Sequence, residues 1–196
     1  MKKALILLGL AAALAGCASK GPAPATYDFG PMSAPAASAA PAAGAIVVAD
    51  VTGPAALDSQ RMFYRLLYAD ARQARPYAYN TWAATPLQML SQRLKARIAQ
   101  AGVKVISTTD AAGGLPLLRL EADEFTQNFN SASQSAGVIT LRASLFRNHK
   151  LVDQRTFTRS SAAASADAAG GAQALADSCD AIAADILAWL AALPQQ

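Results

Sequence analysis

Two cysteines and one histidine are the side chains of this 196-residue sequence best suited to nucleophilic, acid–base or zinc chemistry. His149 lies in Asn148-His149-Lys150, a segment typical of a tight turn between strands, and a general base there would need partners converging from elsewhere. We therefore interpret His149 as a surface turn residue. Cys179 lies on the apolar side of a predicted helix, where burial suppresses the thiolate, so we expect a structural role. Three such residues are too few for a zinc site of His and Cys ligands.

An acidic cluster is the other candidate for chemistry. Glu121, Asp123 and Glu124 lie on a predicted strand, where positions 121 and 123 share a face. A hydrolase that uses paired carboxylates could employ them, but the sequence offers neither an aromatic sugar platform nor a third polar partner. It also lacks a nucleophile elbow, a dinucleotide-binding glycine loop and a phosphate-binding P-loop. We therefore expect no enzyme, no cofactor and no metal, and nominate no catalytic residue.

The first cysteine has a different explanation. Two lysines at positions 2 and 3 precede an uncharged apolar run, which is the layout of a secretory signal peptide over residues 1–16. The run is too short to span a bilayer, which takes about 20 helical residues. Leu14-Ala15-Gly16-Cys17 resembles the bacterial lipobox, in which the cysteine thiol is lipidated and becomes the new N-terminus. A lipidated Cys17 would carry two or three acyl chains such as palmitate, enough for firm anchoring.

The residue after Cys17 bears on location. An aspartate at that position often retains bacterial lipoproteins in the inner membrane, and here the residue is Ala18. We therefore expect an outer-membrane, lipid-anchored protein that faces the periplasm of a Gram-negative bacterium. The alternative is an ordinary cleaved signal peptide with an incidental cysteine. With Cys17 lipidated, Cys179 has no partner within the chain, so the fold must be stable without a disulfide.

Composition excludes one large class of partner. Removal of residues 1–16 lowers Lys+Arg from 17 to 15 against 13 acidic residues, a net charge of about +2. No basic stripe with interleaved aromatic residues is present, so we expect no nucleic-acid binding.

Residues 17–45 are dominated by Ala, Pro, Ser and Gly and predict a linker. The segment TYDFG at 26–30 interrupts it. Tyr27 and Phe29 are two residues apart, so they point to the same side of an extended chain and predict a short docking strand. The tether from Cys17 to Tyr27 would then reach at most about 35 Å.

The remaining residues, 46–194, predict one domain. Strands are expected at 46–51 and 103–108, and a hairpin at 61–70 and 75–84, although 61–70 also fits a short helix. Residues 85–102 predict a helix with Thr85 as N-cap, Pro86 in the first turn and Gly102 after the end.

Segments 115–129, 137–148 and 150–161 predict an antiparallel meander, and apolar and polar residues alternate along the second of them. A second amphipathic helix is expected from about residue 171 to 193. The fold class is therefore α+β: a mixed or antiparallel sheet with two amphipathic helices packed on one face. The helix at 85–101 is expected to bridge strands at different places in the sheet.

Two segments resemble a known family. LDSQRMFYR at 57–65 and YAYNTWAATPLQML at 77–90 are similar to the hallmark segments of the ABC-type transport auxiliary lipoproteins, a PqiC-like family associated with MCE-domain lipid transport. The family pattern continues with an acidic residue and Phe at the end of a strand, as in EADEF at 121–125. Many members carry an acidic residue after Trp-Ala, where this chain has Ala84. The matching positions are Leu57-Asp58, Arg65, Tyr77, Tyr79, Trp82-Ala83 and Pro86.

The resemblance implies a non-catalytic outer-membrane lipoprotein that assists an ABC/MCE-type intermembrane lipid transport system. Its partners would be an MCE-domain protein and the permease/ATPase complex, and a homo-oligomer is compatible with it. Tyr77, Tyr79 and Trp82 are the expected partner-contacting surface, because Tyr and Trp suit interfaces; the alternative makes them core residues of a hairpin under the helix. The alternative function is an outer-membrane assembly or envelope-stabilising lipoprotein that binds a barrel protein or peptidoglycan.

Overall fold

A long meander forms one half of the sheet. The computed structural model describes residues 23–32, 44–110 and 113–194, so the expected signal peptide, Cys17 and most of the linker lie outside the described residues. Strand β6 (Leu117–Ser131) pairs antiparallel with β7 (Gln134–Arg147), which pairs antiparallel with β8 (Lys150–Ala162). Inward positions of β7 alternate with outward ones, as expected for a sheet with one solvated face. The predicted meander is confirmed.

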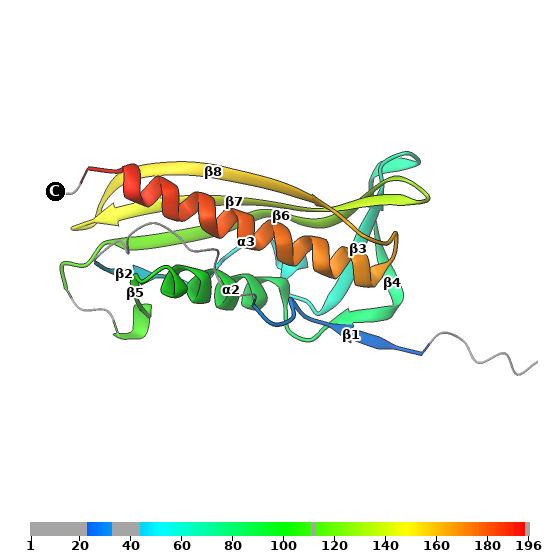
Figure 1. The fold of residues 1–196 in the computed structure, drawn as a ribbon, viewed down its shortest axis with the longest axis horizontal. Coiled ribbons are helices and arrows are strands. Elements are labelled where there is room, and N and C mark those ends of the chain that lie inside the picture. Colours follow the sequence, from blue (N-terminus) through cyan, green and yellow to red (C-terminus); the bar gives the residue numbers. More distant parts are fainter. Residues whose placement is uncertain (1–22, 33–43, 111–112, 195–196) are drawn as a thin grey trace, which may run out of the picture.

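The other edge of β6 carries two separate groups of strands (Figure 1). Near its start β6 pairs in parallel with β2 (Ala45–Val48), which also pairs in parallel with β5 (Lys104–Ile106). Near its end β6 pairs in parallel with β3 (Arg61–Leu66). The expected hairpin follows, because β3 pairs antiparallel with β4 (Asp70–Trp82). The sheet is therefore mixed.

Helix α2 (Pro86–Gln100) connects these two groups, since it runs from β4 to β5. Thr85 caps it: the hydroxyl accepts from the Gln88 amide, and the Gln88 side chain accepts from the Thr85 amide. Gly102 beyond its end has a φ of 86°, which favours glycine. The predicted caps and the bridging role of this helix are confirmed.

Helix α3 (Ala168–Ala192) lies on the same face of the sheet as α2 (Figure 1). It begins three residues before the predicted start because Asp167 is its N-cap, accepting from the Gly170 amide at 2.8 Å. Among the described residues, neither helix is long and apolar enough to cross a membrane. The α+β class, with two helices on one face of a mixed sheet, is confirmed.

The segment at 26–30 forms the expected docking strand. Strand β1 (Ala25–Tyr27) pairs in parallel with the end of β4, with Tyr27 opposite Trp82. Phe29 is buried, and its ring centroid lies 6.4 Å from that of Trp82 and 6.0 Å from that of Phe125. The N-terminal segment is therefore part of the core.

One carboxylate fastens the two helices together. Asp180 of α3 accepts 2.7 Å hydrogen bonds from Nε and Nη2 of Arg93 on α2 and also accepts from Arg97, one turn later. Arg93 donates through Nη1 to the Gly30 carbonyl oxygen at 3.1 Å, which ties in the N-terminal segment. Burial alone would raise the pKa of Asp180, but hydrogen bonds from Arg97 and Arg93 outweigh it and lower that pKa to about 2.

We predict that Asp180→Asn lowers the free energy of unfolding at pH 7 by about 3 kcal/mol, because it leaves two largely buried guanidinium groups without their carboxylate. A carboxyl with a depressed folded-state pKa stabilises the fold above its unfolded pKa of about 4 and loses that contribution as pH falls toward 2. The wild type should therefore lose stability across this window more steeply than the variant. Urea titrations monitored by tryptophan fluorescence at several pH values measure both effects.

Asp185→Asn is the matched control, because Asp185 lies on the same helix and pairs with an arginine on the exposed side, Arg159. Its effect on the free energy of unfolding should be much smaller. Equal losses in the two variants would contradict the prediction that the Asp180 cluster fastens the helices.

Candidate functional site

The residues first considered for chemistry do not form a catalytic arrangement. His149 is exposed in the turn between β7 and β8, where Asn148 and His149 have φ values of 48° and 63°. Cys179 is fully buried, and burial raises the pKa of its thiol. The interpretation of His149 as a turn residue and of Cys179 as a buried structural residue is confirmed.

The acidic cluster lies on the open face of the sheet. Arg142 of β7 contacts Glu121 at 3.3 Å and Asp123 at 3.1 Å, so both carboxylates are engaged by one partly exposed guanidinium. Glu124 follows a register shift and accepts from the Asn128 side chain. Within the described residues, no three His, Cys, Asp or Glu side chains gather into a metal-binding group.

Trp82 does not form part of a surface. It is 3 % exposed and packs edge-on against Phe29 and Phe125 at the base of the hairpin. Its assignment to a partner-contacting surface is wrong, and the alternative that it belongs to the core is confirmed. The segment that follows β1 contributes to this burial, because its Phe29 packs against the indole ring.

Tyr77 also points inward. Its ring centroid lies 4.6 Å from that of Tyr64, and its hydroxyl donates to Gln127 Oε1 at 3.0 Å. Burial raises the pKa of this hydroxyl. Gln127 is itself fully buried and donates to Ser135 Oγ at 2.8 Å and to the Asp167 carbonyl oxygen at 2.9 Å. Tyr77 is therefore one end of a buried polar network that joins β4, β6, β7 and the start of α3.

Tyr79 alone of the three is on the surface, with 48 % of its area exposed. The pairing of β3 with β4 explains the difference, since Arg61 is opposite Thr81 but Phe63 is opposite Pro76. The extra residues of β4 form an irregularity that turns Tyr79 outward, although it is two positions from Tyr77.

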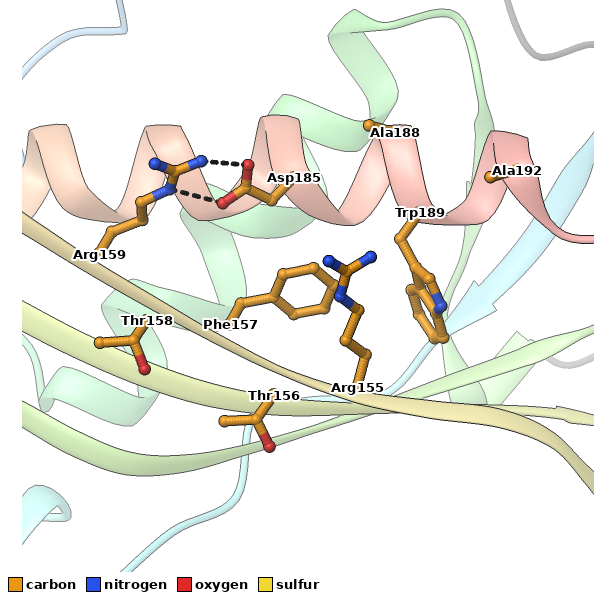
Figure 2. Close-up of a pocket in the computed structure, with 9 residues that line it drawn as sticks. All are labelled: Arg155, Thr156, Phe157, Thr158, Arg159, Asp185, Ala188, Trp189 and Ala192. Atoms are coloured by element: carbon orange, nitrogen blue, oxygen red, sulfur yellow. Dashed lines mark hydrogen bonds and ion pairs between the residues drawn. The ribbon is translucent and has the colours of Figure 1, made fainter.

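A groove lies between β8 and α3 (Figure 2). Its volume is about 380 Å³. Phe157 and Trp189 form its buried floor with ring centroids 5.8 Å apart, and the Trp189 Nε1 donates to Asp153 at 2.8 Å. The residues that line the groove are Arg155, Thr156, Phe157, Thr158, Arg159, Asp185, Ala188, Trp189 and Ala192.

Two arginines border this apolar floor. The Arg155 guanidinium carbon lies 5.5 Å from the centroid of the Phe157 ring, a cation–π contact. Arg159 forms a bidentate pair with Asp185, with Nε at 2.6 Å from Oδ2 (Figure 2). This pair holds Arg159 against α3 at one end of the groove, while Arg155 stands over the floor.

The groove follows an open sheet edge. Among the described residues, the 13-residue strand β8 pairs with β7 alone, so backbone groups along its other side have no strand partner. Such an edge can accept an extended segment of another chain through main-chain hydrogen bonds. The open edge of β8 therefore runs beside a groove with polar walls and a buried aromatic floor, an arrangement that can receive an extended segment of another chain.

Comparison with known proteins agrees with this architecture. A crystal structure of a Xanthomonas campestris protein of the DUF330 family superposes with a TM-score of 0.71 at 21 % identity, covering 84 % of this chain and 94 % of the other. A second, uncharacterised protein gives 0.68 at 17 % identity, covering 86 % and 99 %. A hypothetical protein of Chlamydia trachomatis gives 0.50 at 9 % identity, covering 75 % and 95 %. These likenesses show a shared fold.

The sequence itself matches a family model. The model for the ABC-type transport auxiliary lipoprotein component covers residues 27–187, from β1 to the last turns of α3. No match was found among curated proteins.

We predict that Tyr77→Phe lowers the free energy of unfolding by about 1–2 kcal/mol, because it removes the donor to a buried amide oxygen. Tyr79→Phe is the matched control two residues away, where the side chain is exposed, and it should be close to neutral. Thermal and urea unfolding of both variants measure the difference. If Tyr79→Phe were the more destabilising change, the inward role of Tyr77 would be refuted.

Proposed function

Because the chain belongs to the ABC-type transport auxiliary lipoprotein family, we propose that it is a non-catalytic outer-membrane lipoprotein that assists an ABC/MCE-type intermembrane lipid transport system. The observation that carries the proposal is the family match, which spans nearly all of the described domain. The contacts of the described residues support it, because Glu121 and Asp123 are paired with Arg142, Cys179 is buried and His149 is in an exposed turn.

The physical task suits a binding protein. Lipid chains are costly to expose to water, so transport between two membranes needs a protected route and a component that receives it at the far membrane. Such a component needs an anchor and a contact surface rather than reacting groups. An MCE-domain protein, together with the permease and ATPase of the transporter, is the proposed partner.

Cys17 supplies the proposed anchor. Its lipobox-like context predicts an acylated N-terminus, and Ala18 after it favours the outer membrane. Two or three acyl chains hold a protein at a bilayer far more firmly than one. The described domain begins at Ala23, so it would stay close to the bilayer that holds the anchor.

The β8–α3 groove supplies the proposed contact with the transport partner. An extended partner segment could add to the free edge of β8 and place one apolar side chain on the floor formed by Phe157 and Trp189. Arg155 beside that floor favours a segment that carries a carboxylate.

We predict that Ala188→Trp weakens partner binding by about tenfold or more, because Ala188 lines the groove and a large ring there would fill it. Ala191→Trp is the control, since Ala191 is exposed on the same helix and does not line the groove. The full chain is cross-linked in the cell envelope and purified, and the captured proteins are identified by mass spectrometry. Wild type and control should retain an MCE-domain protein or the permease.

The other outcomes of the capture experiment separate the transport role from the groove contact. Capture of a barrel protein or peptidoglycan alone would contradict the transport role and favour the envelope-stabilising alternative. Capture of the MCE-domain protein with equal yield from both variants would reject the groove as the contact and leave the transport role intact.

The anchor has its own test. We predict that the mature N-terminal peptide carries diacylglyceryl and acyl groups on Cys17, and that Cys17→Ser abolishes this mass and releases the protein from outer-membrane fractions. Mass spectrometry of the membrane-extracted protein measures the modification. An unmodified thiol in protein recovered from the soluble fraction would refute the proposed anchor.

A further inference from the structure

The tip of the β3–β4 hairpin exposes two large apolar side chains in succession. Leu67 is 40 % exposed and Tyr68 is 53 % exposed, in the turn between Leu66 and Asp70. A backbone hydrogen bond closes the turn, in which the amide of Ala69 donates to the Leu66 carbonyl oxygen at 3.0 Å. The two side chains are therefore available for a contact outside the domain.

The tip is held firmly. The Leu67 amide donates to the Phe129 carbonyl oxygen at 2.9 Å, which ties the turn to the end of β6. Arg65 donates through Nη1 to the carbonyl oxygens of Ala71 and Arg72 at 3.3 and 3.4 Å. A braced turn loses little conformational entropy when it binds, which favours a preformed contact.

The same hairpin carries an excess of positive charge. Arg65, Arg72 and Arg75 lie within ten residues of one another, against a single carboxylate, Asp70. Asp70 itself accepts the Arg72 amide at 2.9 Å, and Arg75 donates to the Gln73 side chain. Apolar side chains at a tip with arginines behind them match the depth profile of a phospholipid surface, where phosphates lie above the acyl chains.

The β3–β4 tip and the N-terminal start of β1 lie at the same end of the domain. Strand β4 runs from the tip toward α2, and β1 is parallel to it with Ala25 opposite Asn80. At this pairing the start of β1 lies on the tip side of Trp82, although the register irregularity between Pro76 and Thr81 separates this part of β4 from the tip. In Figure 1 the start of β1, at the lower right, and the β3–β4 tip, at the upper right, lie at the same end of the long axis, opposite the C-terminus. Cys17 precedes Ala25 by eight residues, which span at most about 28 Å.

We infer that the β3–β4 tip is a second membrane contact, in which Leu67 and Tyr68 enter the headgroup region of the phospholipid leaflet that holds the anchor and the neighbouring arginines bind lipid phosphates. Tyrosine is well suited to this depth, since its ring is apolar and its hydroxyl can stay hydrated. The inference rests on the proposed function for the lipid anchor at Cys17. Together, anchor and tip would fix the orientation of the domain on the membrane.

A tryptophan placed at the tip tests the contact. The full chain is reconstituted into vesicles of phosphatidylethanolamine and phosphatidylglycerol, with or without brominated acyl chains that quench nearby indoles. Tyr68→Trp carries the reporter at the tip, and Leu151→Trp is the matched control, because Leu151 is 54 % exposed beside the β7–β8 turn at the other end of the domain. The two native tryptophans are buried and provide a constant background, measured with the wild type.

We expect the added emission of Tyr68→Trp to be quenched about twofold or more, and that of Leu151→Trp to match the wild-type background. Flotation of the same vesicles reports anchoring separately. Protein that floats without selective quenching of Tyr68→Trp would overturn the tip contact and leave the anchor intact. Protein that does not float would overturn both the anchor and the tip contact.

Discussion

The close approach of α3 to the sheet is the constraint on which the remaining architecture depends. A Cβ atom at Gly137 of β7 would lie 2.5 Å from the Leu175 amide nitrogen, and one at Gly171 would lie 2.0 Å from the Gln127 side chain. At Gly137 the neighbours are backbone atoms, so this position requires glycine, whereas a side chain at Gly171 would displace the Gln127 amide from its hydrogen bonds. Without these glycines the helix would be pushed off the sheet at its N-terminal end, where Tyr77, Gln127, Ser135 and Asp167 share their hydrogen bonds.

The short distance between α3 and the sheet also explains why a polar network is tolerated in the core. The Gln127 amide would be costly to bury unpaired, but at this distance it reaches the carbonyl oxygen of the helix N-cap, Asp167. Ser178, further along α3, donates to the Gly137 carbonyl oxygen at 2.7 Å. Polar groups thus fix the position of α3 along the sheet, while the Asp180 carboxylate fixes α2 against α3. Apolar packing alone would allow either helix to slide.

The predictable features are those encoded within a few residues of each other. Alternation marked the meander, and Thr85, Pro86 and Gly102 marked both ends of α2, because caps and strand faces are local. The burial of Trp82 and Tyr77 could not be read in the same way, since it depends on β1 and on Gln127, which lie about 50 residues away. The sequence does not predict the groove for the same reason: Arg155 and Phe157 share one face of β8, but Ala188 and Trp189 come from a helix about 30 residues later. Gly171 is one local indication of the close approach between helix and sheet, because glycine destabilises the interior of a helix and is expected there where packing is tight.

The two proposed contacts lie at opposite ends of the domain, so a tip bound to the membrane would set the orientation of the groove. The groove is lined by the last turns of α3, whereas the β3–β4 tip lies beyond the start of this helix (Figure 1). A helix of 25 residues is about 37 Å long, so a membrane-bound tip would hold the groove away from the bilayer surface. The open edge of β8 would then face the periplasm, where a component from the inner membrane approaches. A short anchor alone would allow the domain to tumble, and a second contact at the tip is what would keep this edge presented in one direction.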